Sequence, residues 1–432
     1  MLALLITLDC VRADHVGPDS GLTPNLDALR EEVTLFPNTY SQSQNTLSSH
    51  LSMLTSNYLF QHGVYSNFEP KELPSHALPN RLTERGWHCN AFTSVDFLSL
   101  LLGSQIGGPD PYYPPAEDRS LRARVMRRLR GRRSPASDTL NAGLRWLDGL
   151  PSGSDAFLWL HLFDAHMVYE APRWYLNRHT FGGAADETVT QQLEEKGWFS
   201  PHFPEYEKRL PLEHFPGRYR AAVAYQDAMV GDFVCALKAK GWWEDCFFVL
   251  TADHGECLLG DHGVYCAHKK LFDTTVRVPL QVRFPGGKHR GEVVDALVQH
   301  VDIAPTAAAL AGFEESRYMG RDLAAAAEGG GGHGFAFAEH VNGFLRAARD
   351  REVVFVERVP GSENKWGLRM EEGSLFLGDG RPAPEEVRGR AAGLERQMRE
   401  LLASGASIAE DWGRAAEAED EVASRLRDLG YM

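Results

Sequence analysis

Three separate apolar segments of this chain each end in an aspartate or a histidine. They are residues 2–8 before Asp9, residues 156–163 before Asp164 and His166, and residues 246–251 before Asp253 and His254. Short, continuous apolar runs are typical of the central strands of a parallel sheet, which is buried on both faces. The carboxyl ends of such strands meet at one edge of the sheet, where open α/β sheets bind their ligands. The sequence therefore predicts a doubly wound α/β fold with a functional site at that edge.

Further helices and strands are expected around these three segments. Helical patterns cover residues 78–87 and 219–238 and the Ala-rich stretch after His300, and strand patterns cover residues 89–93 and 276–282. The composition changes at Gly329–Gly332, after which short strand-like pieces and charged helical sequence follow. We therefore expect a large α/β domain over residues 1–334, with a mostly parallel sheet flanked by helices. A small C-terminal α+β part over residues 335–432 should pack on it.

Charge and cysteine usage narrow the class of protein. The formal net charge of −14 disfavours a nucleic-acid partner, because a polyanion is repelled on average. A basic stretch from Arg119 to Arg133 is either a solvated surface or a docking surface for an anionic partner. Six scattered cysteines favour reduced thiols and a cytoplasmic protein. No segment approaches the ~18 apolar residues of a membrane span, and residues 1–8 lack the basic start of a signal peptide.

A polar loop at Asn45-Thr46 leads into a short helical pattern, which places Thr46 at a helix N-terminus. Unpaired N–H groups there favour anions, although an isolated threonine at such a place is more often a simple helix cap. Together with Asp9, Asp253 and His254, Thr46 completes a set of oxygen and nitrogen donors for one divalent cation. Two carboxylates, an imidazole and a hydroxyl favour Mn²⁺ or Zn²⁺, with Ca²⁺ a poorer match because it prefers oxygen ligands alone.

A series of short motifs occurs in a fixed order along most of the chain. They are Ile6–His15, Thr23–Asp27, Thr46–Thr55, His62–Val64, Leu160–His166, Leu250–Glu256, Arg277–Leu280 and, at the end, Arg425–Tyr431. In these motifs the chain resembles the sulfatase-like branch of the alkaline phosphatase superfamily. The resemblance implies an alkaline phosphatase-like fold and an ester hydrolase.

The resemblance also implies roles for individual residues. The implied metal ligands are Asp9, Asp253 and His254, and Thr46 is the implied nucleophile. The pocket for the oxygens and the leaving group of the ester is implied to be lined by Asn67, His166 and His268.

Three positions depart from the sulfatase pattern. Sulfatases carry Cys or Ser at the position of Thr46, because only these can be oxidised to the formylglycine aldehyde, whereas a threonine would give a ketone. The Pro and Arg of the sulfatase signature are Ser48 and His50 here, and a second metal-binding Asp is Cys10. The resemblance is therefore closest to the phosphodiesterases and phosphonate monoester hydrolases that use a threonine nucleophile.

From these observations we predict a metal-dependent hydrolase of phosphodiesters or phosphonate monoesters that acts through a covalent phospho-threonine. Its partner would be a small anionic ester. Three alternatives stay open, namely a sulfuric ester hydrolase, a soluble phosphoryl transferase and a binding module that keeps the fold without the activity. The sequence does not determine the substrate, the identity of the metal or the oligomeric state. A homo-oligomer stays open.

Overall fold

The computed structural model describes most of the chain. The described residues are 1–67, 72–95, 98, 102, 104–106, 135–167, 169–179, 214–259, 261–263, 265–341, 343–359, 361–362 and 374–405. The basic stretch from Arg119 to Arg133 and the motif at Arg425–Tyr431 lie outside them.

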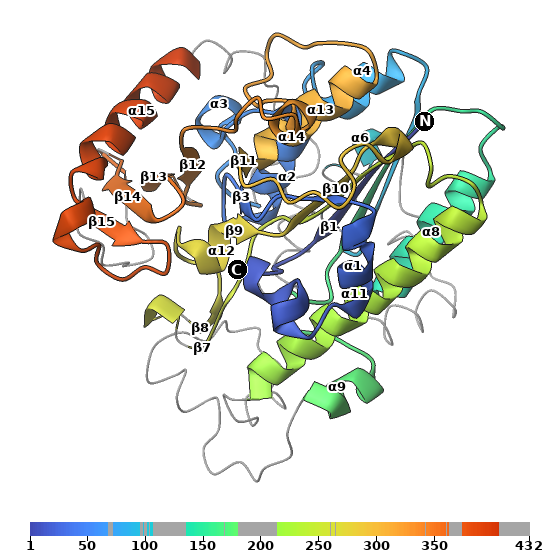
Figure 1. Ribbon diagram of the computed structural model, residues 1–432, viewed down its shortest axis with the longest axis horizontal. Coiled ribbons are helices and arrows are strands. Elements are labelled where there is room, and N and C mark those ends of the chain that lie inside the picture. Colours follow the sequence, from blue (N-terminus) through green and yellow to red (C-terminus); the bar gives the residue numbers. More distant parts are fainter. Residues whose placement is uncertain are drawn as a thin grey trace, which may run out of the picture.

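A six-stranded sheet forms the centre of the molecule (Figure 1). Its strand order is β2-β10-β6-β1-β5-β4. β1 runs parallel to β5 and β6, and β4 runs parallel to β5, whereas β10 is antiparallel to both of its neighbours. The strands are β1 Leu2–Leu8, β2 Thr34–Leu35, β4 His88–Thr93, β5 Ala156–Leu162, β6 Cys246–Ala252 and β10 Leu280–Arg283. The predicted α/β fold with a mostly parallel sheet is confirmed.

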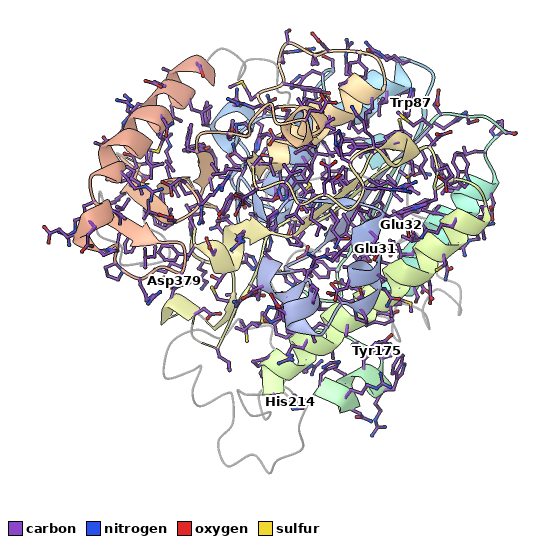
Figure 2. All side chains as sticks on the ribbon, in the orientation of Figure 1. Glu31, Glu32, Trp87, Tyr175, His214 and Asp379 are labelled. Carbon is purple, nitrogen blue, oxygen red and sulfur yellow. The ribbon has the colours of Figure 1, made fainter. Side chains whose placement is uncertain are left out.

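Helices cover both faces of this sheet (Figure 1). One face carries α1 Pro24–Ala28, α8 Ala136–Asp148 and α11 His214–Ala239, and α9 Arg173–His179 packs on α11. The other face carries α2 Thr46–Thr55, α4 Leu78–Thr83, α13 Ile303–Leu310 and α14 Leu323–Ala327. Tyr175 of α9, labelled in Figure 2, packs on Tyr225 of α11, with ring centroids 5.4 Å apart.

Alternation along the strands decides which face each side chain meets. In β1 the even-numbered apolar residues pack with α8 and α11, whereas Ala3 and Leu5 pack with α2 and α13. Thr7 and then Asp9 continue the odd-numbered series. The polar residues at the carboxyl end of β1 are therefore directed toward α2.

Several short elements complete the main part of the chain. A small sheet has the order β11-β3-β9, with β3 Asn38–Tyr40, β9 Arg277–Val278 and β11 Leu297–Gln299. β7 Cys257–Leu259 pairs with β8 Tyr265–Ala267, and the short helices are α3 Leu59–His62, α6 Ser104–Ile106 and α12 Asp273–Val276. Single 3₁₀ turns lie at Ala13–His15, Pro18–Ser20, Leu29–Glu31, Asp261–Gly263, Pro285–Gly287, His300–Asp302 and Glu385–Val387.

The prediction of one strand over residues 276–282 was wrong. Those residues divide into the end of α12, β9 in the small sheet and β10 in the central sheet. Pro279 lies between the two strands, and a proline has no N–H to donate to a sheet. The chain therefore changes sheets at this residue.

A four-stranded antiparallel sheet follows the Gly-rich stretch. It consists of β12 Ala336–Glu339, β13 Leu345–Arg349, β14 Val353–Arg358 and β15 Ser374–Leu377. α15 Arg390–Gly405 packs on it through Leu394 and Met398 (Figure 1). Glu339 N–H donates to the carbonyl of Gln42 at 2.9 Å, so this sheet adjoins the loop that precedes α2. A division of the chain at residue 334 stays a prediction.

No helix within the described ranges is both long enough and apolar enough to cross a membrane. All six cysteines are free thiols.

Asp164 is expected to make the stability of the protein depend on pH. Its buried carboxyl accepts from Ala136 N–H at the start of α8 (3.2 Å) and from Gln226 Nε2 (3.3 Å). Burial raises the pKa of this carboxyl from 3.8 to about 7. As the pH rises, the unfolded chain loses this proton at about pH 4, whereas the folded protein keeps it until about pH 7. The free energy of unfolding should therefore fall as the pH rises from about 4 to about 7, by up to about 1.4 kcal/mol per pH unit.

Asp164→Asn tests this expectation, because asparagine keeps an oxygen for Ala136 N–H but does not titrate. Denaturant titrations at about pH 4.5 and about pH 6.5 should show a larger loss of stability in the parent protein than in the variant. An equal loss in both proteins would show that Asp164 is not the group responsible.

Candidate active site

A row of three polar side chains forms the floor of the site. Thr7 of β1 is in register with His161 of β5 and with Thr251 of β6, and all three are fully buried. The next odd-numbered positions after β1 and β6 are Asp9 and Asp253. The register of the parallel strands therefore brings these two aspartates together at the carboxyl edge of the sheet.

Asp9, Asp253 and His254 offer one ligand atom each within 4.8 Å of one another. Asp253 Oδ1 accepts from the N–H groups of Cys10 (3.1 Å) and His254 (2.7 Å). Asp253 Oδ2 is buried, has no hydrogen-bond partner among the residues that the structure describes, and lies 3.5 Å from His254 Nε2. A buried carboxylate oxygen without a partner is costly unless a cation meets it, so this atom fits a metal site.

His254 offers a nitrogen lone pair on the side of its ring that faces Asp253 Oδ2. Its Nδ1–H donates to the carbonyl of Gly255 at 2.9 Å, which leaves Nε2 of the neutral ring as the unprotonated nitrogen. A Cβ at position 255 would lie 2.2 Å from the carbonyl oxygen of Thr274, so only glycine allows this close approach. Two carboxylates, an imidazole nitrogen and the nearby Thr46 hydroxyl together form a donor set that fits a divalent cation.

Thr46 is the first residue of α2, and its hydroxyl does not cap the helix. Asn45 is the N-cap, with its Oδ1 accepting from Ser48 N–H at 3.4 Å. Thr46 Oγ1 instead lies 3.4 Å from Asp9 Oδ2 and 3.5 Å from His254 Nε2. The interpretation of Thr46 as a simple helix cap is therefore wrong. The hydroxyl lies between metal-ligand candidates at the positive end of a helix, which favours a negative oxygen.

Asn67 supports the first turn of α2. Its Oδ1 accepts from Leu47 N–H at 2.9 Å. Its Nδ2 is buried and has no hydrogen-bond partner within the described part of the chain. The structure therefore places an unused donor beside the helix start that carries Thr46.

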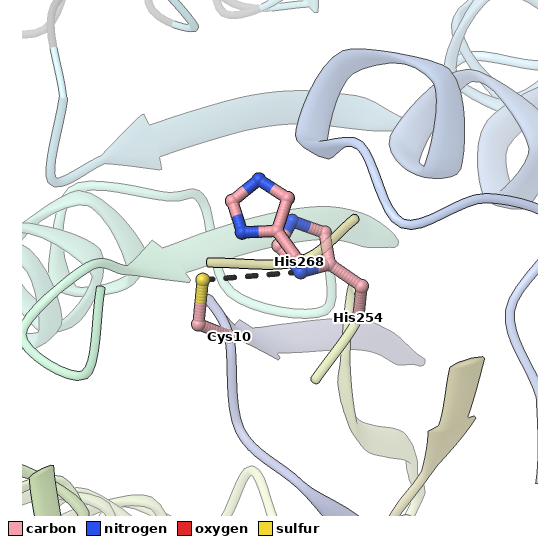
Figure 3. Close-up of side chains that lie close together, drawn as sticks. All are labelled: Cys10, His254 and His268. Carbon is pink, nitrogen blue, oxygen red and sulfur yellow. Dashed lines mark hydrogen bonds between the residues drawn. The ribbon is translucent and has the colours of Figure 1, made fainter. Parts of the chain in front are cut away.

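Cys10 and His268 lie close to the His254 ring (Figure 3). Cys10 Sγ lies 3.8 Å from His254 Nδ1, and the rings of His254 and His268 have centroids 4.3 Å apart. Cys10 has a φ of 62°, a conformation that few residues other than glycine adopt. The sequence placed Cys10 at the position of a second metal-binding aspartate but did not count it among the predicted ligands.

His166 and His268 lie next to each other, with ring centroids 5.9 Å apart. His166 stacks on Phe163 at 4.3 Å, and its Nδ1 donates to the carbonyl of Met167 at 2.8 Å. His268 is partly buried, and burial lowers its pKa to about 4. Its Nδ1 faces Glu256 Oε1 at 3.7 Å, and burial raises the pKa of Glu256 to about 8. The two histidines thus lie on the Cys10 side of His254.

Two further histidines, which the sequence did not place among the predicted site residues, lie at the site. His161 Nε2 donates to Asp9 Oδ2 at 3.0 Å, and both groups are fully buried. His50 Nδ1 donates to the carbonyl of Thr46 at 2.7 Å, and burial lowers the pKa of His50 to about 3. The position of His161 could have been predicted from the sequence, because it continues the alternating residues 157, 159 and 161 that face α2.

The sequence of this chain is similar to those of known sulfatases. A model of the Sulfatase family matches residues 2–313. The N-acetylgalactosamine-6-sulfatase of Canis lupus familiaris is 25% identical over 332 residues, which cover 69% of this chain and 59% of that protein. An uncharacterized sulfatase, YidJ of Escherichia coli (strain K12), is 27% identical over 185 residues, or 41% of this chain and 36% of YidJ. The chain thus spans less than two thirds of the length of these relatives.

Two solved structures share the fold over nearly the whole chain. The phosphonate monoester hydrolase of Agrobacterium radiobacter has a TM-score of 0.67 and 19% identity, and the match covers 93% of this chain and 95% of that one. The structure of BT4656 in complex with its substrate D-glucosamine-2-N,6-O-disulfate has a TM-score of 0.70 and 17% identity, covering 97% and 99%. At these identities the likeness concerns the fold alone.

Proposed function

This chain belongs to the sulfatase family, and from that premise we propose that it is a metal-dependent hydrolase of phosphodiesters or phosphonate monoesters that forms a covalent phospho-threonine at Thr46. One observation carries the proposal: residue 46 is a threonine whose hydroxyl faces Asp9 and His254. Oxidation of a threonine gives a ketone and not the formylglycine aldehyde. This position therefore acts through its hydroxyl.

The proposed ion is held by Asp9, Thr46, Asp253 and His254, with Mn²⁺ or Zn²⁺ favoured over Ca²⁺. When bound, such an ion lowers the pKa of a hydroxyl and neutralises the oxygens of an incoming phosphoryl group. The orphan Oδ2 of Asp253 supports this assignment, because it is the buried charge that the ion would meet.

The proposed reaction has two displacements at phosphorus. Thr46 Oγ1 attacks phosphorus, the ester bond to the leaving alcohol breaks, and the hydroxyl proton passes to Asp9 Oδ2, which lies 3.4 Å away. Water then attacks phosphorus and the bond to Thr46 breaks. Thr46 takes back the proton held by Asp9, and the proton released by water replaces the one that the leaving alcohol took up. The unused Nδ2 donor of Asn67 suits a non-bridging oxygen, whose charge grows in the transition state.

We assign His166 and His268 to the leaving group of the ester. His268→Ala should then lower kcat by about 10²–10³-fold, because the leaving oxygen loses the N–H group of the neutral imidazole that would stabilise its charge. The bound metal should stay, because the proposed ion lies among Asp9, Asp253 and His254, although His268 forms a second possible ligand group with Cys10 and His254. Steady-state kinetics and elemental analysis of the same preparation measure both effects. Loss of the metal from this variant would instead make His268 a ligand.

A hydrolysis panel tests the proposed substrate class. An aryl sulfate, a phosphate monoester, a phosphodiester and a phosphonate monoester are compared at equal concentration, each with Mn²⁺, Zn²⁺ and Ca²⁺. The highest kcat/KM is expected for the phosphodiester or the phosphonate monoester. A preference for the aryl sulfate would overturn the proposal.

A sulfuric ester hydrolase is the second candidate, and the curated relatives named above favour it. It would require direct hydrolysis of a threonine sulfate ester, because the elimination open to a hydrated aldehyde is not open to Thr46. A soluble phosphoryl transferase is the third candidate. Adding an alcohol acceptor to the panel would reveal it as a new ester product.

A further inference from the structure

A chain of hydrogen bonds runs beneath Thr46, and the proposed reaction does not use it. Trp159 Nε1–H of β5 donates to Thr7 Oγ1 of β1 at 2.9 Å. Thr7 Oγ1 lies 2.9 Å from His50 Nε2, and His50 Nδ1 lies 2.7 Å from the carbonyl oxygen of Thr46. All four residues are fully buried. The chain thus links two central strands to the first residue of α2.

The direction of every proton in this chain is fixed by its two ends. An indole N–H can only donate and a carbonyl can only accept. His50 must therefore carry its proton on Nδ1, which leaves Nε2 of the neutral ring as an acceptor. Thr7 accepts from Trp159 and donates to His50. Thr7 and His50 each use one donor and one acceptor in this chain, so the His50 ring cannot flip without breaking two buried bonds.

His50 is held but does not touch the reacting hydroxyl. Both of its nitrogens are occupied by Thr7 and by the Thr46 carbonyl. Its ring packs against those of Trp159 and His161, with centroids 4.8 and 5.1 Å away. These contacts leave His50 no nitrogen with which to act as the general base.

Ser49, the residue before His50, holds the same first turn of α2 through a second set of contacts. Ser49 Oγ–H donates to the carbonyl of Asp253 at 2.7 Å and lies 3.2 Å from His300 Nδ1. His300 Nε2 in turn lies 3.2 Å from Thr251 Oγ1 of β6. The first turn of α2 is therefore anchored to β1 and β5 through His50, and to the Asp253 loop through Ser49.

We propose that His50 is a positioning residue that directs the Thr46 hydroxyl toward Asp9 and His254 through the chain Trp159–Thr7–His50. The inference rests on the proposed role of Thr46 as nucleophile. The N–H groups at the start of a helix have no helical partners, so side chains must hold the first peptides in place. The Thr46–Leu47 peptide is held at its N–H by Asn67 Oδ1 and at its carbonyl by His50 Nδ1, and these contacts fix the residue that carries Oγ1. A displacement of about 1 Å at a reacting atom costs about 10²-fold in rate.

Two substitutions at His50 separate its two contacts. His50→Asn places an amide where Nδ1 lies, so it keeps the donor to the Thr46 carbonyl and loses the contact with Thr7. His50→Gln places an amide where Nε2 lies, so it keeps the contact with Thr7 and loses the donor to Thr46. His50→Gln should lose about 10²-fold in kcat with KM and bound metal unchanged, and His50→Asn should stay within about tenfold of the parent.

The outcome distinguishes positioning from a structural role. If His50 only fills space, both variants lose thermal stability and neither shows a selective fall in kcat. Equal kcat values in folded, metal-loaded preparations of the two variants would overturn the inference. Should either variant fail to fold, Thr7→Val and Thr7→Ser test the same chain, with a fall in kcat expected for valine and not for serine. An equal kcat in that second pair would also overturn it.

The rate at which the phosphoryl adduct forms keeps this inference separate from the proposed function. His50→Gln should slow formation of an adduct on Thr46 in a rapid-quench experiment, while the adduct stays on Thr46. If the parent protein forms no adduct on Thr46, the proposed function fails. If the parent forms it and His50→Gln forms it at the same rate, only the role of His50 fails.

Discussion

Thr46→Ala is expected to lower kcat by on the order of 10⁴-fold or more, because the substitution removes the attacking oxygen itself. The variant should remain folded, since Asn45 and Asn67 cap the first turn of α2 without using the Thr46 hydroxyl. Alanine is also a good helix former. Steady-state kinetics on the best substrate of the panel, with circular dichroism as a check of the fold, measure the effect.

Thr46→Ser is the matched control. It keeps a hydroxyl at the same place and loses only a methyl group, so the phosphodiester or phosphonate activity should remain within about tenfold of the parent. A fully active Thr46→Ala variant would contradict the account. A serine variant as inactive as the alanine variant would show that more than the hydroxyl matters at this position.

Asp253→Asn is expected to abolish metal binding and, with it, turnover. Asparagine keeps an oxygen that accepts from the N–H groups of Cys10 and His254, so the local fold should survive. It replaces the orphan charged Oδ2 by an amide N–H₂, which repels a cation. Metal affinity should fall by more than about 100-fold, beyond the loss typical of residues that only orient a ligand. Elemental analysis after extensive dialysis measures the metal content.

Asp227→Asn is the control for this substitution. Asp227 is also a buried aspartate, but it accepts from Asn25 N–H (3.1 Å) and Leu26 N–H (2.8 Å) at the start of α1. Its replacement should reduce stability and leave the metal in place. If the Asp253→Asn variant binds about one ion per chain as tightly as the parent protein, Asp253 is not a metal ligand.

Local pattern in the sequence was sufficient to predict the central strands. β1 and β6 match their predicted runs within one residue, because a strand buried on both faces must be apolar throughout. The same argument located Asp9 and Asp253 at one edge of the sheet. In the structure Asp9 and Asp253 lie together, and the Thr46 hydroxyl lies 3.4 Å from Asp9 Oδ2.

Features that depend on distant contacts could not be predicted in this way. The break at Pro279 is local, but the sheets that β9 and β10 join depend on partners elsewhere in the chain. The contact of His50 with Thr7 joins residues 43 positions apart, and that of His161 with Asp9 joins residues 152 apart. Periodicity can assign a side chain to a face of the sheet, but not to a partner across that face.

The identity of the covalent intermediate tests the central claim most directly. The parent protein is mixed with its best phosphodiester or phosphonate monoester substrate, quenched in acid during turnover and digested. High-resolution mass spectrometry, which separates a phosphoryl from a sulfuryl adduct of the same nominal mass, is applied to the peptide that contains Thr46. We expect a phosphoryl adduct on Thr46 that disappears when the substrate is exhausted. Turnover without any adduct on Thr46, or an aldehyde at Ser48 or Ser49 in its place, would contradict the proposed mechanism.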